Sequence, residues 1–191
     1  MPELAHLDAR EGRLPHYPAC VPRAPLLAAA LGLALAAAGI ALETQRGGAP
    51  SPPALEGTVL AVHDGDTLTL RLPSGRERVR LAQIDAPERG QPWGRRARQA
   101  LERIAEGRRA RLVLLDRDDY GRAVGDLYVD EVFVNELLVR EGHAWAYPRY
   151  VRSPRILDAE EDARRAGRGL WRLPPVEREP PWKWRASLPR K

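Results

Sequence analysis

The hydrophobic pattern in the middle of the chain predicts a group of short β-strands. Residues 57–62 are apolar and β-prone, and residues 67–72 alternate apolar with polar side chains. Runs of this kind, bounded by turn residues, are typical of strands. A third strand is expected at about 77–84, joined to the second by the turn 73–75, which reads Pro-Ser-Gly.

The pattern after these strands predicts helices and two further strands. Four apolar residues share one face of a helix that Gly107 is placed to cap; they are Ala97, Ala100, Leu101 and Ile104. Strands follow at about 111–115 and 124–129, Asn135 is expected to cap a short helix, and 157–166 is expected to be helical. Short strands with helices between and after them predict an α+β, mainly β fold. We expect a small closed barrel with about three appended helices.

The N-terminal part of the chain has a different character. Residues 1–23 are polar, and residues 24–42 are rich in Ala and Leu and carry no charge. The length of the apolar run is close to what spans a hydrocarbon core, so it is either a transmembrane signal anchor or a signal peptide, and both alternatives stay open. Three arginines precede the run and one closely follows it, which favours export of the part after it. Residues 43–54 then read as a Gly/Pro-rich linker.

Composition changes this picture only slightly. The chain has 191 residues, a net charge of +5 and an isoelectric point near 9.9, which suit one domain with extensions and permit a polyanionic partner. Its single cysteine, Cys20, excludes a disulfide within the chain. We place the folded domain at 55–173 and a Pro/Trp-rich tail at 174–191.

Acidic residues stand at the ends of the predicted strands. Asp64 and Asp66 lie between the first two strands, where Asp-Gly is also a common turn dipeptide. Asp85 ends the third strand, and Pro87 holds it in a fixed relation to Glu88. Carboxylate and carbonyl oxygens in such an arrangement suit a hard cation.

Two arginines have a context that separates them from the many others. Arg80 lies in the strand that ends at Asp85, and Arg122 follows a Tyr-Gly turn after an acidic run. Guanidinium binds two phosphate oxygens at once. Together with the carboxylates, this pattern is what metal-assisted attack on a phosphodiester would require.

These motifs closely resemble those of the staphylococcal-nuclease-like family, or thermonucleases. The sequence shows Asp-Gly-Asp-Thr at 64–67, Arg80 with Asp-Ala-Pro-Glu at 85–88, and Tyr-Gly-Arg at 120–122, in the family's order. The resemblance runs from about 56 to 171 and implies an OB-fold with a five-stranded barrel.

The resemblance also implies roles for particular residues. Calcium would be bound by the carboxylates of Asp66 and Asp85 and by the carbonyl of Ala86, with Glu88 as the general base. Arg80 and Arg122 would hold the phosphate, and Tyr120 and Tyr147 would contact the nucleotide, although Tyr147 also fits a half-buried strand aromatic. The family's type member has Thr in place of Ala86 and a basic residue in place of Asp119. The first change leaves a carbonyl ligand intact, and the second puts the endo/exo balance in question.

The sequence therefore predicts a calcium-dependent nuclease that cleaves single-stranded or frayed DNA and RNA with little sequence specificity. We expect a monomer, either membrane-anchored with an exported nuclease domain or secreted or periplasmic after cleavage. The alternative is a non-catalytic OB-fold module that binds nucleic acid or protein. The presence of the complete set of site residues favours the nuclease.

Overall fold

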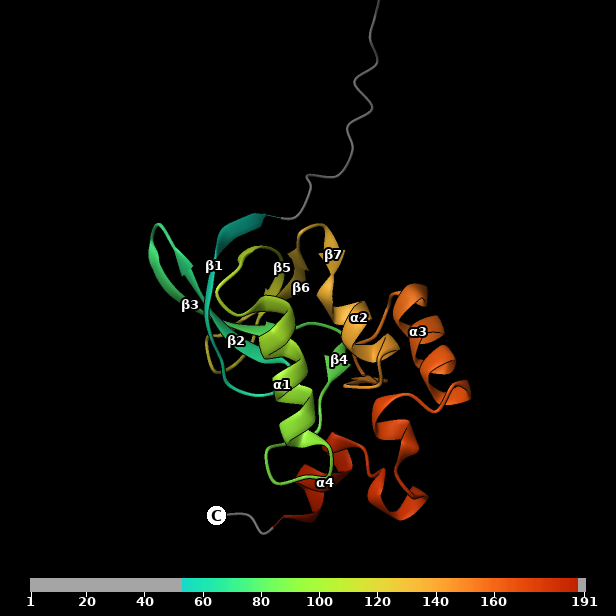
Figure 1. The fold of residues 1–191 in the computed structure, drawn as a ribbon. Coiled ribbons are helices and arrows are strands. Elements are labelled where there is room, and N and C mark those ends of the chain that lie inside the picture. The colour runs from blue at the N-terminus through green and yellow to red at the C-terminus, as the bar shows by residue number, and fades with distance from the viewer. Residues whose placement is uncertain (1–52, 189–191) are drawn as a thin grey trace, which may run out of the picture. The chain divides into compact units, whose positions relative to one another are not determined.

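A closed β-barrel forms the centre of the described part of the protein, residues 53–188 of a computed structural model (Figure 1). Its five strands are β1 (Ala54–Val62), β2 (Thr67–Leu72), β3 (Gly75–Leu81), β5 (Arg109–Arg117) and β6 (Ala123–Val129). The strands lie in the order β3-β2-β1-β5-β6, and parallel pairing of β3 with β6 closes the barrel. The expected five-stranded OB-type barrel is confirmed.

Alternating side chains fill the barrel. β6 alternates strictly between buried and half-buried residues, and the inward positions of the other strands carry aliphatic side chains. Leu68, Leu70, Val79, Leu112 and Leu127 are completely or almost completely buried. Successive side chains of a strand point to opposite faces of the sheet, so the apolar positions of the alternating pattern face the core and the polar positions face the surface.

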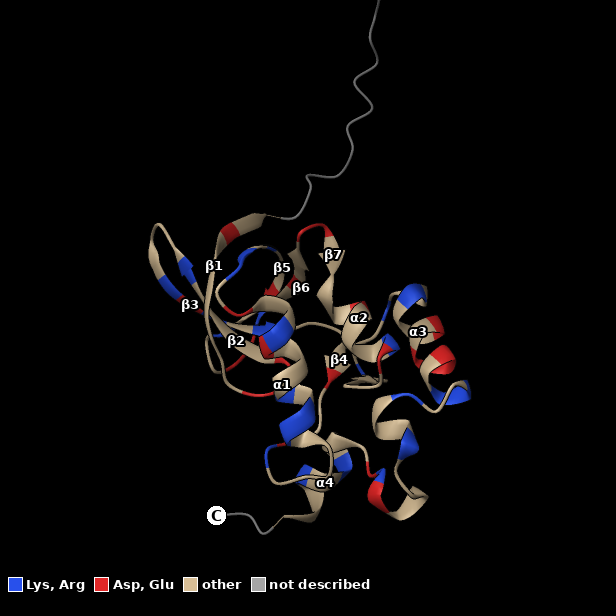
Figure 2. Ribbon diagram, viewed as in Figure 1, with Lys and Arg blue, Asp and Glu red and all other residues tan. Residues whose placement is uncertain are grey.

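Residues 53–188 contain four α-helices: α1 (Gly94–Ala105), α2 (Val134–Arg140), α3 (Pro154–Arg165) and α4 (Pro181–Ser187). The predicted apolar face of α1 is buried against the core, and α3 packs on α2 (Figure 1). The expectation of about three helices omitted α4, which lies in the Pro/Trp-rich tail. Lys and Arg are spread over α1, α3 and α4 and the β2–β3 hairpin (Figure 2).

Short elements complete the connections. β7 (Val132–Phe133) extends β6 as a hairpin, and two 3₁₀ turns, Gly169–Arg172 and Pro175–Glu177, lead from α3 to α4. Two-residue strands β4 (Ile84–Asp85) and β8 (Trp145–Ala146) pair outside the barrel.

The third strand is shorter than the sequence predicts. It ends at Leu81, and Gln83 takes a left-handed conformation with φ of 67° before β4 begins. The Gln83 side chain holds this bend, since its oxygen accepts hydrogen bonds from the backbone N–H groups of Arg152 and Ser153 at 3.0 and 2.9 Å. Asp85 therefore lies on a separate small strand and not at the end of a barrel strand.

The predicted apolar span 24–42 lies outside the described residues. Within residues 53–188, no helix is long and apolar enough to cross a membrane.

One half-buried contact joins the start of α1 to the segment after α2. The indole N–H of Trp93 donates a hydrogen bond to Nδ1 of His143 at 3.1 Å, and the two rings stack. Burial lowers the pKa of His143 to about 4, because a protonated imidazole would lose its hydration, and the positive charge of Arg103 acts in the same direction.

This contact predicts a pH-dependent stability. The pKa of His143 is lower in the folded protein than its value of 6.5 in the unfolded chain, so His143 contributes its full stabilisation at pH values above 6.5. This contribution is lost as the pH falls toward 4. The free energy of unfolding should fall by about 3 kcal/mol from this group across that range. Urea denaturation between pH 7 and pH 4 should show a weaker pH dependence in His143→Gln than in the parent; parallel curves would contradict the assignment.

Candidate active site

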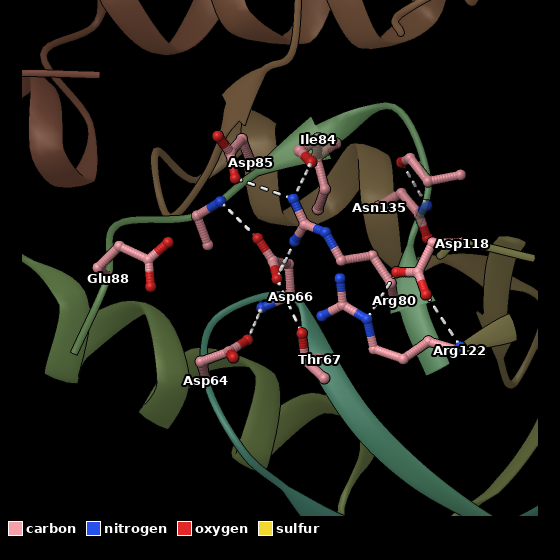
Figure 3. Close-up of polar contacts among 12 residues, drawn as sticks. Asp64, Asp66, Thr67, Arg80, Ile84, Asp85, Glu88, Asp118, Arg122 and Asn135 are labelled. Atoms are coloured by element: carbon pink, nitrogen blue, oxygen red, sulfur yellow. Dashed lines mark hydrogen bonds and ion pairs between the residues drawn. The ribbon is translucent and has the colours of Figure 1, made fainter. Parts of the chain in front are cut away.

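A cleft of about 1010 Å³ opens at one end of the barrel. Seven of the eight residues singled out in the sequence line it: Asp66, Arg80, Ala86, Glu88, Tyr120, Arg122 and Tyr147. Asp85 lies directly behind this lining, with its side chain only 1% exposed. Figure 3 shows Asp66 and Arg80 between Glu88 and the pair formed by Arg122 and Asp118. His63 and His143 do not line the cleft.

The loop between β1 and β2 presents Asp66 to the cleft. Oδ1 of Asp64 accepts a hydrogen bond from the backbone N–H of Asp66 at 3.1 Å, which fixes the turn. A Cβ at Gly65 would approach the methyl groups of Ala86 and Ala97 to 2.6 and 2.8 Å. The Asp-Gly dipeptide is therefore more than a generic turn, because only glycine lets the loop pack this closely against α1.

Arg80 joins the two carboxylates assigned to the metal. Its Nη1 pairs with Oδ1 of Asp66, and its Nη2 donates to Oδ1 of Asp85 at 2.9 Å (Figure 3). Burial acts to lower the pKa of Arg80, but the two carboxylates outweigh it and hold the pKa above its usual value. The guanidinium therefore stays charged in a nearly buried position.

The segment after β4 carries Ala86 and Glu88. The backbone N–H of Ala86 donates to Oδ2 of Asp66 at 2.7 Å, so the β1–β2 loop and this segment are tied together. The backbone N–H of Glu88 donates to Oε1 of Gln91 at 3.1 Å. A side chain at Gly94 would collide with the carbonyl oxygen of Glu88, so glycine is required where α1 begins.

Arg122 is held by Asp118, a residue to which the sequence analysis assigned no role. Nε of Arg122 donates to Oδ2 of Asp118 at 2.7 Å, and Oδ1 of Asp118 accepts from the backbone N–H groups of Arg122 and Tyr120. Among the described residues, no acceptor contacts the Nη atoms of Arg122. They are available to an anion in the cleft.

The two predicted nucleotide-binding tyrosines differ in their surroundings. Tyr120 is 86% exposed, and the guanidinium of Arg122 lies 5.5 Å from its ring centre. Tyr147 is half-buried and stacks on Trp182 of α4, with ring centres 5.3 Å apart and an interplanar angle of 12°. A base could stack freely on Tyr120, whereas Trp182 covers one face of Tyr147.

The charge state of the aspartates reflects their crowding. Burial and the negative charge of Asp66 together raise the pKa of Asp64 to about 6. Burial has the same tendency at Asp66, but Arg80 overcomes it and holds the pKa of Asp66 below its usual value. Burial raises the pKa of Asp85, and a hydrogen bond from Arg185 opposes this rise.

Calcium is the metal that the family resemblance implies, and the donor chemistry fits it. Asp66, Asp85 and the Ala86 carbonyl would supply hard oxygen ligands, and the neighbouring Asp64 is crowded against the negative charge of Asp66. Within residues 53–188, no three His, Cys, Asp or Glu side chains converge as a preformed metal site. Between Asp66 and Asp85 the structure places Arg80.

Two further contacts of the site were missed in the sequence. Arg185 of α4 reaches Asp85 and Glu88, although the tail was given no role. Asn135 was predicted to cap α2, but no side chain makes a capping hydrogen bond at the start of this helix. The Trp-Lys-Trp-Arg run at 182–185 was the only sequence feature that could have drawn attention to Arg185.

Asn135 instead braces the bend before β4. Its Nδ2 donates to the carbonyl oxygen of Ala82 at 2.9 Å, and its Oδ1 accepts from the backbone N–H of Leu127 at 3.0 Å. The side chain is completely buried, so these backbone groups have no access to water. Asn135 therefore links β6 to the segment that carries Asp85, and Figure 3 shows it beside that segment.

These observations define a class of domain: a five-stranded barrel that carries carboxylates and arginines on one cleft. Residues 78–173 match the family described as staphylococcal nuclease homologue. The chain belongs to the staphylococcal nuclease family.

Relatives from bacteria and plants agree with this membership. An uncharacterized endonuclease of Escherichia coli is 38% identical over 133 residues, which cover 69% of this chain and 85% of that protein. A micrococcal nuclease of Shigella flexneri is 38% identical over 143 residues, with 69% and 80% covered. A probable staphylococcal-like nuclease of Oryza sativa subsp. japonica is 40% identical over 108 residues. That match covers 56% of this chain but only 32% of the rice protein, so the chain spans about a third of that relative's length.

The bracing role of Asn135 predicts a large loss of stability on its removal. Asn135→Ala leaves the buried carbonyl of Ala82 and the buried N–H of Leu127 without partners, at about 1–3 kcal/mol for each group. Asn135→Asp keeps the acceptor for Leu127 but removes the donor, and adds a buried charge. Urea denaturation should show a clear loss for both variants. An unchanged midpoint for Asn135→Ala would contradict the bracing role.

Proposed function

We infer that this protein is a nuclease that hydrolyses phosphodiester bonds of DNA and RNA with little sequence specificity. The observation that carries the proposal is the meeting of Glu88, Arg122, Arg80 and Asp66 on one cleft. The similarity to proteins named as nucleases, covering most of the length of the bacterial relatives, supports it. Because each of these residues comes from one chain, we further propose that the monomer is active.

The chemistry follows from the placement of the side chains. Glu88 accepts a proton from the water molecule, whose oxygen forms a bond to phosphorus as the bond from phosphorus to the leaving oxygen breaks. The leaving oxygen takes a proton from solvent, and Glu88 returns its proton to solvent. Arg122 is suited to the negative charge that grows on the phosphate oxygens, because its Nη atoms are available and Asp118 fixes its orientation. Arg80 adds positive charge while it holds Asp66 and Asp85 in position.

Calcium dependence is part of the proposal. Asp66, Asp85 and the Ala86 carbonyl would hold the ion, which when bound supplies positive charge to the phosphate and to the attacking water. Tyr120 offers a stacking surface for an unpaired base, which suits single-stranded or frayed substrates. Basic residues on α1, α3 and the β2–β3 hairpin (Figure 2) would attract the polyanion without reading its sequence.

The roles of Glu88 and Asp66 can be separated by the response to calcium. Glu88→Gln should lower turnover by roughly 10²–10⁴ at every calcium concentration, because it removes the base and not the metal ligand. Asp66→Asn should weaken calcium binding, so that added calcium partly restores its turnover. The measurement is degradation of single-stranded DNA and of RNA against calcium concentration, with a chelator arm in which the parent should be inactive.

Glu161→Gln serves as the control, since this glutamate is exposed on α3 and does not line the cleft. Full activity in chelator would reject calcium. Rescue of Glu88→Gln by calcium would move Glu88 to the metal ligands. Tight binding of single-stranded DNA with no cleavage under any condition would favour the non-catalytic binding module.

We also propose that the nuclease domain acts outside the cytoplasm, anchored by residues 24–42 or released after their cleavage. The apolar character and length of that run support this location. In fractionated cells, the protein should appear in the membrane or in the exported fraction. Recovery of the intact chain in the cytosol would reject both forms of the proposal.

A further inference from the structure

The last described helix reaches into the cleft through one side chain. Nη2 of Arg185 donates to Oδ2 of Asp85 at 2.7 Å, and its Nη1 donates to Oδ1 of Asp85 at 3.1 Å and to Oε1 of Glu88 at 2.6 Å. One guanidinium thus makes a two-pronged contact with one carboxylate and a single contact with the other. Such charge-assisted forks fix geometry as well as adding attraction.

Glu88 depends on this contact more than Asp85 does. Asp85 is buried and is also bound by Arg80, whereas the Glu88 side chain is 37% exposed. Among residues 53–188, Arg185 is the only side chain that forms a hydrogen bond or ion pair with the Glu88 carboxylate. Without it, Glu88 would be free to change rotamer at the rim of the cleft.

A second connection ties the same tail to the backbone of Glu88. Oε1 of Gln91 accepts a hydrogen bond from the Glu88 N–H, and Nε2 of Gln91 donates to the carbonyl oxygen of Glu179, two residues before α4 begins. Gln91 is buried, and both the oxygen and the nitrogen of its side-chain amide form hydrogen bonds in this bridge. The tail therefore contacts Glu88 through the side chain and, by way of Gln91, through the main chain.

Aromatic packing sets the position of α4. Trp182 stacks on Tyr147 and meets Trp145 edge-on, with ring centres 5.9 Å apart in the second pair. Pro181 at the start of the helix is buried. Arg185 follows Trp182 by three residues and so lies on the same side of the helix.

We propose that Arg185 is a positioning residue for the nuclease reaction: α4 docks on Trp145 and Tyr147 so that Arg185 holds Glu88 in the orientation needed to accept a proton from water. Oε1 of Glu88 is bound to Arg185, and Oε2 is left for the water. This inference rests on the proposed function and extends the catalytic unit beyond residue 173.

The first test is the kinetics of Arg185→Ala beside Lys183→Ala. Loss of orientation should lower kcat by about 10–100-fold with a much smaller change in KM, because misplacement of a catalytic group by about 1 Å can cost that much. Lys183 is an exposed residue of the same helix with the same charge, so Lys183→Ala controls for charge and helix content and should resemble the parent. Arg185→Lys should recover part of the loss, and millimolar guanidinium chloride should partly rescue Arg185→Ala where sodium chloride does not.

The second test asks whether Arg185 acts through Glu88. In a Glu88→Gln background, Arg185→Ala should cause little further loss, since the base it orients is already absent. Trp182→Ala, which removes the docking contact, should lower kcat in the parent and add little to Arg185→Ala. Thermal unfolding of each variant identifies any loss that comes from unfolding.

Two kinetic outcomes would overturn the proposal. Fully additive losses in the double variant would show that Arg185 does not act through Glu88. Unchanged or faster turnover in Arg185→Ala, with tighter calcium binding by calorimetry, would show that the guanidinium obstructs the cleft.

A third measurement needs no turnover and so separates this proposal from the proposed function. Without nucleic acid, the ¹³C resonance of the Glu88 carboxyl should shift in Arg185→Ala and stay in place in Lys183→Ala. An identical resonance in all three proteins would overturn the contact itself, whether or not the protein cleaves DNA.

Discussion

The arrangement of the cleft depends on the ion pairs of the nearly buried Arg80 guanidinium. Arg80 comes from barrel strand β3 and binds Asp66 of the β1–β2 loop and Asp85 of β4, so three separate pieces of chain are fixed by one side chain. A buried charge of this kind is costly unless it is paired, and loss of one partner typically costs 3–5 kcal/mol. The two aspartates and Arg80 therefore stabilise each other's burial, and the exchange of any one of them has a cost in stability.

Closure of the barrel brings the second arginine to the same place. In the parallel pairing of β3 with β6, Arg80 lies opposite Val124, two residues after Arg122. Parallel pairing sets both strands running toward the same end of the barrel. The strand pair that closes the core thus also brings together two positive charges, and Asp66, Asp85 and Asp118 compensate them.

Local pattern was sufficient for most of the elements and for most of the cleft. The barrel strands and α1 follow from periodicities of two and 3.6, and residues such as Asp66 and Arg122 were found because they stand at element ends. What the pattern could not show are contacts between distant segments. The bend at Gln83 is held by backbone groups near residue 152, and Asn135 bonds to β6 and to Ala82 and not to its own helix. The contacts at Gln83 and at Ala82 join residues that are distant in the sequence, so no local pattern could have predicted them.

The contact between Arg185 and Asp85 spans 100 residues, and this separation has a consequence for the order of folding. A chain is made from its N-terminus, and the five barrel strands end at residue 129. The hydrophobic core also includes side chains of α2 and α3, up to Ala159, and all of these precede the tail. Arg185 is therefore made after every residue of this core. The order of synthesis thus makes the partner of Asp85 and Glu88 one of the last residues that the chain receives.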